Sequence, residues 1–328
     1  MVRLHGGIES QQSAREPRRF VRDILSTQGL LFLALMIIWI ILSFATPYFF
    51  TATNMRNLMR QTAIIGIVSI GMTYVIIGAG IDLSVGSVVA LSNVVTALLL
   101  VQGRTIFAIL PIALLLAAMV GLTNGMVTFE GKVPDFIATL GMMGICRGVA
   151  LLLSHGRNIA GLPREFTSIA RESIGGIPIL FIIFISIAII SQFILSCTRF
   201  GIHLYGAGGN REAAMLSGIN LRLVKYSQYV ISGLLAGMAG ILLTTRLSMG
   251  MPTAGIGYEL DAIAAVVIGG ASLFGGEGNV MGTVIGALLV STLYNGANLL
   301  GVDPFWQRIM IGVLIILTVL IDQVRKRG

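Results

Sequence analysis

The sequence predicts an all-α protein that crosses a membrane about ten times. Three observations lead to this prediction. First, 55% of the 328 residues are hydrophobic and only 11% are charged, whereas a soluble domain has roughly 25% charged residues. Second, the mean hydropathy is +0.92. Third, several runs of about 18 or more residues carry no charge, which is the length that a membrane-spanning helix needs.

The expected spans form a transmembrane domain at 29–322, with polar tails at 1–28 and 323–328. The first tail is basic and lacks a convincing small-residue cleavage site, so we expect an uncleaved first helix. An even number of spans places both tails on one side, and their Arg and Lys residues indicate the cytoplasm. The spans are expected at 29–45, 61–79, 84–101, 105–127, 135–154, 177–196, 225–245, 261–275, 280–299 and 307–322.

Two stretches of the chain resemble each other. "GIDLSVGSVVALS" (80–92) is similar to "YELDAIAAVVIGGAS" (258–272), which aligns Asp82 with Asp261. In both stretches glycines precede an acidic residue at the start of an apolar segment. Glycine lets the backbone leave helical geometry, so the pattern predicts broken helices at corresponding places.

A second pair of similar segments supports an internal repeat: "NGMVTFEGKVPDF" (124–136) and "NGANLLGVDPF" (295–305). The repeat predicts two halves of about five spans each, at 29–155 and 177–322. Halves with an odd number of spans must be inverted relative to each other, which is a common plan of transporters.

Asp82 lies between two uncharged segments that are each long enough to span a membrane. Asp82 or Ser84 can accept hydrogen bonds from the free N–H groups of the following helix. Two interpretations stay open. Asp82 caps a helix at the membrane surface, or it caps a helix that also lies beside a translocation pathway, because irregular backbone at membrane depth needs protein or a watery cavity around it.

The polar loop at 197–222 contains the pattern of a short surface helix. "GGN" at 208–210 predicts a turn, Asn210 is a favourable N-cap, Glu212 complements the helix dipole and Gly218 is a natural end. A helix of about two turns is marginal in isolation, so docking on another protein is favoured over a simple connector. The expected contact surface comprises Ala213, Ala214, Met215 and Leu216.

The chain resembles the permease subunit of bacterial ABC-type monosaccharide importers, the group that carries ribose, arabinose, xylose and galactosides. The block at 252–278 is the most specific and is most similar to ribose permeases. The resemblance runs from about residue 28 to 322. It is carried by "GIDLSVG" at 80–86, "FIATLGMMGICRGVA" at 136–150, "RFGIHLYGAGGNREAAMLSGIN" at 199–220, "PTAGIGYELDAIAAVVIGGASLFGGEG" at 252–278 and "NGANLLG" at 295–301.

This resemblance implies a multi-pass protein of the bacterial inner membrane that works as a permease dimer, with a homodimer favoured. It also implies two cytoplasmic ABC ATPase subunits, which bind ATP and Mg²⁺, and a periplasmic sugar-binding protein. A ribose-like pentose is the favoured substrate. The segment that meets the ATPase is implied to be a coupling helix formed by Gly208, Gly209, Asn210, Arg211, Glu212, Ala213, Ala214, Leu216 and Gly218.

A neutral sugar needs hydrogen-bond donors and acceptors along its path but no net counter-charge. Arg147 lies inside an expected span, where pairing with a carboxylate or a carbonyl is favoured over contact with sugar. The candidate pathway residues are Asp82, Ser84, Asn93, Asn124, Arg147, Glu259, Asp261, Asn295 and Asn298.

Several other functions lack the required residues. "EGKV" (130–133) is not a GxxxxGK[ST] phosphate loop, so the chain is expected to bind no ATP itself. No Cys/His cluster indicates a metal site, and no basic run with interleaved aromatics indicates nucleic acid. "GASLFG" (270–275) has a serine, but the histidines lie in loops or the tail, which disfavours a protease. We expect no catalytic residue. The main alternative is an ion-coupled secondary transporter or a channel that uses intramembrane carboxylates.

Overall fold

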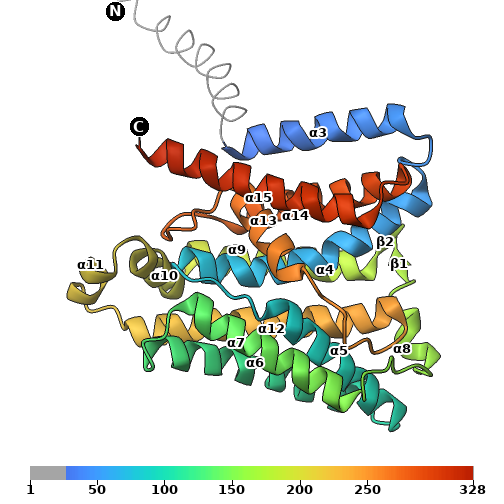
Figure 1. Ribbon diagram of the computed structural model, residues 1–328, viewed down its shortest axis with the longest axis horizontal. Helices are drawn as coiled ribbons and strands as arrows, with labels where there is room; N and C mark the ends of the chain where they lie inside the picture. Colours follow the sequence, from blue (N-terminus) through green and yellow to red (C-terminus); the bar gives the residue numbers. More distant parts are fainter. Residues whose placement is uncertain (1–26, 328) are drawn as a thin grey trace, which may run out of the picture.

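Long apolar helices run side by side through the computed structural model, which describes residues 27–327 (Figure 1). Seven helices in this part of the chain are long and apolar enough to cross a membrane. They are α3 (Thr27–Ala45), α4 (Ala52–Ile77), α6 (Ile106–Phe129), α7 (Asp135–Leu153), α9 (Ile179–Cys197), α12 (Leu221–Leu247) and α14 (Val280–Leu299).

Three shorter or more polar helices fall on the remaining predicted spans. They are α5 (Val85–Val101), α13 (Tyr258–Ile268) and α15 (Pro304–Arg327), and the apolar part of α15 is Pro304–Leu320. Each predicted span therefore coincides with a helix. The all-α, polytopic fold class is confirmed.

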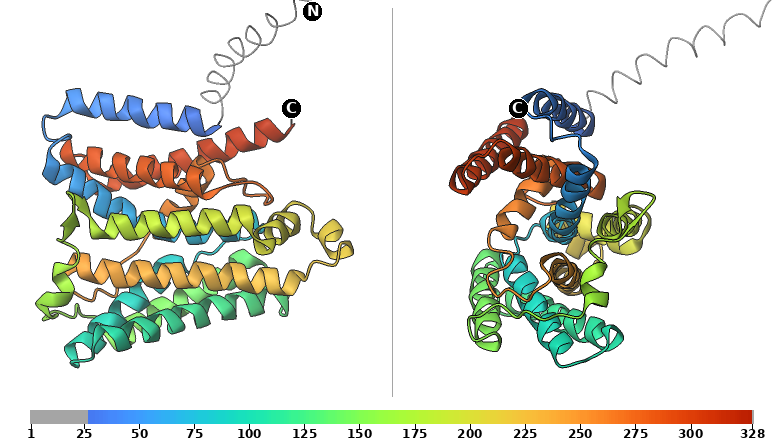
Figure 2. Two further views of the ribbon diagram at one scale, coloured as in Figure 1. Left: turned by 180° about the vertical axis from the view of Figure 1, so that it is seen from behind. Right: turned by 90° about the vertical axis from the view of Figure 1, so that its right-hand side faces the viewer.

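The short elements gather at the two ends of the bundle. The helix α8 (Arg164–Ser168) and the antiparallel pair β1 (Ser173–Ile174) and β2 (Ile177–Pro178) lie at one end, here called the α8 end. The helices α10 (Arg199–Gly209) and α11 (Arg211–Leu216) lie at the other, the α11 end. Figures 1 and 2 show that α3 starts and α15 finishes at the α11 end.

Several predicted boundaries were wrong. The span expected at 61–79 is the helix α4, which already begins at Ala52. The span expected at 261–275 is the helix α13, which ends at Ile268 because Gly270 takes a φ of +92°. With 11 residues, α13 is about 16 Å long, only half of a hydrocarbon core of about 30 Å. At the C-terminus, the helix α15 continues to Arg327, past the predicted end of the last span at 322. The first tail, up to residue 26, lies outside the described residues.

The centre of the bundle consists of α4, α5 and α12, which carry most of the fully buried side chains. The outer helices α3, α6, α7, α9 and α15 expose large apolar side chains on their outer faces. A helix that is apolar all round belongs either in a core or in lipid. This burial pattern places α4 in the protein core and the outer helices at its surface.

The packing of the two halves is reciprocal. In the first half α4 contacts α12, α13 and α14, and in the second half α12 contacts α4, α5 and α6. In this pattern α4 of the first half corresponds to α12 of the second half, α5 corresponds to α13, and α6 corresponds to α14. The helices α3 and α9 depart from it, because α3 packs on α14 whereas α9 packs on α4.

The aligned aspartates do not occupy equivalent places in the two halves. Asp82 precedes α5, whose N-cap is Ser84, whereas Asp261 lies inside the first turn of α13. The two helix starts do meet, because Gly86 of α5 lies against the carbonyl of Gly255 and the carboxylate of Glu259. The broken helices are therefore real, but the alignment of Asp82 with Asp261 was wrong in register.

Candidate functional site

The break between α4 and α5 is held by the carboxylate of Asp82, which is 1% exposed. Asp82 Oδ1 accepts hydrogen bonds from Ser84 N at 3.0 Å and from Ser84 Oγ at 2.6 Å. Its Oδ2 accepts from Ser232 Oγ of α12 at 2.9 Å. Ser84 in turn accepts from Asn124 Nδ2 of α6 at 2.9 Å. Asp82, directly and through Ser84, therefore connects the break to α5, α6 and α12. The predicted cap of the free N–H groups of α5 was wrong. The N-cap residue is Ser84, and its side chain makes no capping hydrogen bond.

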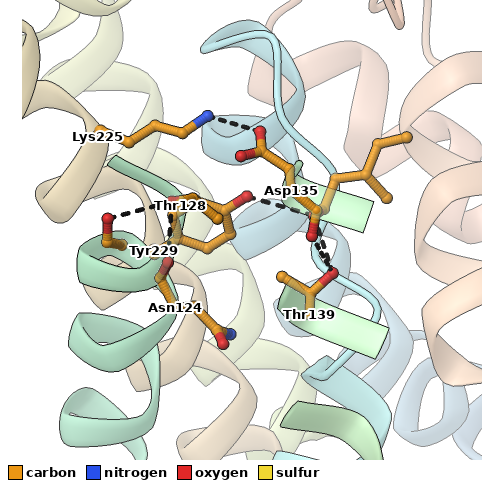
Figure 3. A network of polar contacts seen from close by, with 8 residues as sticks. Asn124, Thr128, Asp135, Thr139, Lys225 and Tyr229 are labelled. Atoms are coloured by element: carbon orange, nitrogen blue, oxygen red, sulfur yellow. Dashed lines mark hydrogen bonds and ion pairs between the residues drawn. The ribbon is translucent and has the colours of Figure 1, made fainter. Parts of the chain in front are cut away.

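A second polar network lies next to this break and is drawn in Figure 3. Lys225 Nζ lies 2.6 Å from Asp135 Oδ2, which joins the start of α12 to the start of α7. The carbonyl of Ile81 accepts from Thr139 Oγ1 at 3.2 Å and from Tyr229 Oη at 3.3 Å. The irregular backbone is therefore satisfied by side chains of α7 and α12, as buried polar groups require.

Other candidate pathway residues are bound within the protein, at places apart from Asp82. Asn93 Nδ2 donates to Thr244 Oγ1 at 2.8 Å, and its Oδ1 accepts from Met251 N. Arg147 donates to the carbonyls of Pro252 at 2.7 Å and Ala254 at 2.8 Å. Pairing of Arg147 with a carbonyl is confirmed, and it holds the segment before α13.

The candidates of the second half also have internal partners. Asp261 accepts from Tyr294 Oη at 2.7 Å, and Glu259 accepts from the N–H of Gly257. Asn295 exchanges two hydrogen bonds with Asn54, and Asn298 accepts from Gln307 Nε2. The structure therefore brings Asp82, Ser84 and Asn124 together, but the candidate pathway residues as a whole do not lie at one place.

The helix α11 confirms most of the predicted loop pattern. Asn210 Oδ1 accepts from Ala213 N at 2.9 Å, and Gly218 ends the helix with a φ of +78°. Two details were wrong. Gly208 and Gly209 form the last residues of α10 instead of a turn, and Ala214 is buried, because it faces the body of the protein.

The outward surface of α11 carries both apolar and charged side chains. Met215 is 60% exposed and Leu216 is 85% exposed, while Arg211, Glu212 and Ala213 are also exposed. Figure 1 shows α11 projecting from the helical bundle. Large apolar side chains on a projecting polar segment are typical of a contact surface.

Three segments meet beneath α11. The N–H of Gly276, in the loop before α14, donates to the carbonyl of Ile77 at 2.8 Å. Gly208 of α10 lies against the same carbonyl, where it has no room for a Cβ. Tyr205 Oη of α10 donates to Gly278 O at 2.6 Å, and burial raises the pKa of Tyr205, which keeps the phenol a donor. We call this contact of Ile77, Gly208 and Gly276 the glycine junction.

Two hollows among the described residues were not indicated by the sequence. A cavity of about 710 Å³ at the α11 end is lined by Gly78, Asp135, Gly208, Arg211 and Gln228, among others. A smaller hollow of about 230 Å³ is lined by Arg60, Arg171 and Arg246. It lies toward the α8 end, because Arg171 lies three residues after the last residue of α8.

Residues 54–319 match the family described as "Branched-chain amino acid transport system / permease component". The chain belongs to this family. It is 43% identical to the ribose import permease protein RbsC of Haemophilus influenzae over 295 residues, which are 89% of this chain and 91% of that protein. RbsC of Bacillus subtilis is 42% identical over 318 residues, 96% of this chain and 99% of that protein. No solved structure matches the chain.

A further relative in the family is the D-allose transport system permease protein AlsC of Escherichia coli. It is 36% identical over 318 residues, which are 96% of this chain and 97% of that protein. The predicted resemblance to sugar permeases is thereby confirmed. As a permease component with several spanning helices, the chain is a multi-pass membrane protein and a transport subunit.

Proposed function

We propose that the chain is the permease subunit of an ATP-driven importer that passes a monosaccharide, favourably a ribose-like pentose, into the cytoplasm. The observation that carries the proposal is the identity of 42% and 43% to ribose import permeases along almost the whole chain. The family description names branched-chain amino acids, so an amino acid is the competing substrate. The sugar is favoured because the three relatives described above, which are 36% to 43% identical to this chain, are named for ribose or allose.

The permease acts as a homodimer with two ATPase subunits, which bind ATP and Mg²⁺ on the cytoplasmic side. Its own residues include no phosphate loop. The exposed Met215 and Leu216 of α11 suit insertion into a groove of the ATPase, because apolar anchors contribute most of the energy of such contacts. Closure of the ATPase subunits on ATP moves α11, and the glycine junction passes this movement to α4 and to the loop before α14.

The opposite end of the molecule receives the sugar-binding protein. Arg60, Arg171 and Arg246 surround the smaller hollow, and none of them forms an ion pair with an acid in the described part of the chain. Arg60 Nε is buried and has no hydrogen-bond partner there. The other nitrogens of the Arg60 guanidinium donate to Asn57 Oδ1 and to the carbonyl of Arg171, both at 3.3 Å, but no carboxylate offsets the charge. Acidic side chains of the binding protein therefore fit this hollow.

An ion-coupled transporter is the alternative. It needs carboxylates that converge on a cation. Asp82 and Asp261 instead accept from hydroxyl groups in different parts of the protein, and the described residues hold no group of three His, Cys, Asp or Glu side chains that could bind a metal ion. The geometry supports an externally driven permease over ion coupling.

Uptake by proteoliposomes tests the proposal. The permease is reconstituted with the ATPase and the binding protein of the same cells and supplied with labelled ribose, allose, xylose, arabinose or leucine. We expect uptake of a sugar that needs ATP and survives collapse of the proton and sodium gradients. Uptake of leucine alone, or uptake that follows an ion gradient without ATP, contradicts the proposal.

The proposed orientation places both termini and α11 in the cytoplasm. Cysteines at Arg211 and Arg164, one at a time in a background without Cys146 and Cys197, report the side through an impermeant thiol reagent. We expect the reagent to label position 164 on intact cells and position 211 only after lysis. Labelling of position 211 from outside contradicts this orientation.

A further inference from the structure

The larger cavity lies where three spanning helices reach the α11 end of the bundle. The helix α6 ends at Phe129, α7 begins at Asp135 and α12 begins at Leu221, and these three residues line the cavity. At about 710 Å³ it has the size of pockets that bind small molecules, roughly 300 to 1,000 Å³. Because spanning helices end where the hydrocarbon core gives way to the head groups, the cavity lies at the membrane surface.

The two carboxylates of the cavity wall are both neutralised by cations of α12. Asp135 lines the cavity, and its Oδ2 lies 2.6 Å from Lys225 Nζ (Figure 3). Glu130 also lines the cavity, and its Oε1 lies 2.6 Å from Arg222 Nε. These two pairs leave no negative charge at the wall that is not already balanced.

Two further cations of the wall are in excess. Lys132, in the loop between α6 and α7, and Arg211, the first residue of α11, both line the cavity. Neither forms an ion pair with an acid in the described part of the chain. Cζ of Arg211 lies 5.9 Å from the centroid of the Phe129 ring, which orients the guanidinium but does not neutralise it. Glu212 follows Arg211 but does not line the cavity. The wall therefore favours an anionic ligand.

The backbone holds Lys132 in an unusual conformation. Its φ is +51°, in the left-handed region that residues other than glycine mostly avoid. The loop is fixed to α6, since the N–H of Val133 donates to the carbonyl of Val127. Such backbone conformations cluster at sites that hold ligands, which agrees with a role for this lysine in binding.

The surface beside the cavity is apolar and exposed. Met126 is 46% exposed and Val127 is 37% exposed on the last turn of α6, and Leu223 is 61% exposed on the first turn of α12. The two helix ends are joined by an edge contact between the rings of Phe129 and Tyr226. Exposed apolar side chains on spanning helices face lipid chains, so the basic wall adjoins a surface that contacts lipid.

We propose that the cavity binds the phosphate of an anionic phospholipid, with Lys132 and Arg211 as its cationic contacts and the apolar ends of α6 and α12 beside its acyl chains. Basic pockets between spanning helices at the membrane surface bind such head groups. A carboxylate of a partner protein would match the charge but not the adjoining apolar surface. A bound phosphate would connect the loop after α6 to the start of α11, so the lipid would help to fix the position of α11.

Binding of phosphatidylglycerol to the assembled transporter tests the site. The delipidated transporter in detergent is titrated with this lipid, and the bound lipids are counted by native mass spectrometry. Phosphatidylcholine with the same acyl chains and soluble glycerol 3-phosphate are titrated in parallel. We expect the tightest phosphatidylglycerol to bind at least about fivefold more tightly than phosphatidylcholine, and glycerol 3-phosphate at equal concentration not to displace it.

A pair of charge reversals assigns this binding to the cavity. Lys132→Glu should weaken the tightest phosphatidylglycerol binding at least about fivefold, since one cation near a membrane surface contributes about that factor. Arg199→Glu is the matched control, because Arg199 is exposed on α10 at the same end and does not line the cavity. Both variants change the net charge equally. If Lys132→Glu does not assemble, Lys132→Gln removes the charge alone and should weaken binding about fivefold.

Three results would overturn the lipid site. The first is equal affinity for phosphatidylglycerol in the Lys132 and Arg199 variants. The second is displacement of the lipid by glycerol 3-phosphate at equal concentration, which would mean that the cavity takes a soluble anion. The third is loss of the ATPase from Lys132→Glu with unchanged lipid binding, which would assign the cavity to an acidic segment of that partner. None of these measurements depends on uptake, so their failure is distinct from a failure of the proposed function.

Discussion

The N–H of Gly276 donates to the carbonyl of Ile77 at 2.8 Å, which joins the loop before α14 to the end of α4. Gly208 of α10 packs against the same carbonyl. One backbone oxygen therefore connects the segment next to α11, the break that leads to Asp82 and the second broken region. Under the proposed function, a displacement of α11 reaches both halves of the permease through this point.

Gly208→Ala should uncouple ATP hydrolysis from transport. Its Cβ would collide with Ile77 O, and a backbone atom cannot rotate away, so α10 must shift at a cost of about 1 to 3 kcal/mol. We expect sugar uptake per ATP hydrolysed to fall on the order of tenfold, measured in proteoliposomes. Gly209→Ala is the matched control, since its nearest neighbour would lie at an ordinary 3.8 Å. Equal coupling in both variants would contradict the transmission of movement through the glycine junction.

Most helices could be predicted from the sequence because long uncharged runs specify them locally. The ends of α11 were also predictable, since Asn210 and Gly218 act within their own turn. The length of α13 was not, because "VVIGGAS" (266–272) keeps a high hydropathy while Gly270 reverses the backbone. Hydropathy measures composition, whereas the end of a helix depends on a single φ angle.

The candidate site was harder to predict, because its contacts join residues far apart in the sequence. Lys225 and Asp135 are 90 positions apart, and no local pattern pairs them. Several candidate asparagines are hydrogen-bonded to other buried groups, as polar residues in apolar helices usually are. No signal in the sequence indicated the cavity, because its walls come from the ends of segments that lie far apart along the chain.

The exposed apolar residues of α11 should be required for binding the ATPase. Leu216→Glu is expected to abolish co-purification of the ATPase while the permease inserts normally, because Leu216 is 85% exposed and supports no internal packing. Ile174→Glu is the control, since Ile174 is 66% exposed at the α8 end. Glu212→Arg combined with Ala213→Asp should also prevent co-purification. Retention of the ATPase by Leu216→Glu and by the double variant would show that α11 is only a connector.

Charge reversal at the smaller hollow should weaken docking of the binding protein. Arg60→Glu with Arg171→Glu places carboxylates where acidic side chains are expected to bind, and a like-charge contact costs several kcal/mol at an interface. We expect the stimulation of ATPase activity by the binding protein to fall at least about tenfold, with the unstimulated rate kept. Arg104→Glu changes an exposed arginine that does not line the hollow and should have little effect. Undiminished stimulation of the double variant would exclude this hollow as the docking site.

Asp82 should act through its hydrogen bonds and not as a proton or cation site. Asp82→Asn can still accept from Ser84, and the hydroxyl of Ser232 can turn to accept from the new amide. Most uptake should therefore remain. Asp82→Leu leaves Ser84 and Ser232 without their partner in a buried site, at about 1 to 3 kcal/mol for each unsatisfied group, so it should lose most of its uptake. Uptake is compared at matched membrane levels. Complete and equal loss in both variants would mean that the negative charge itself is needed, which favours the ion-coupled alternative.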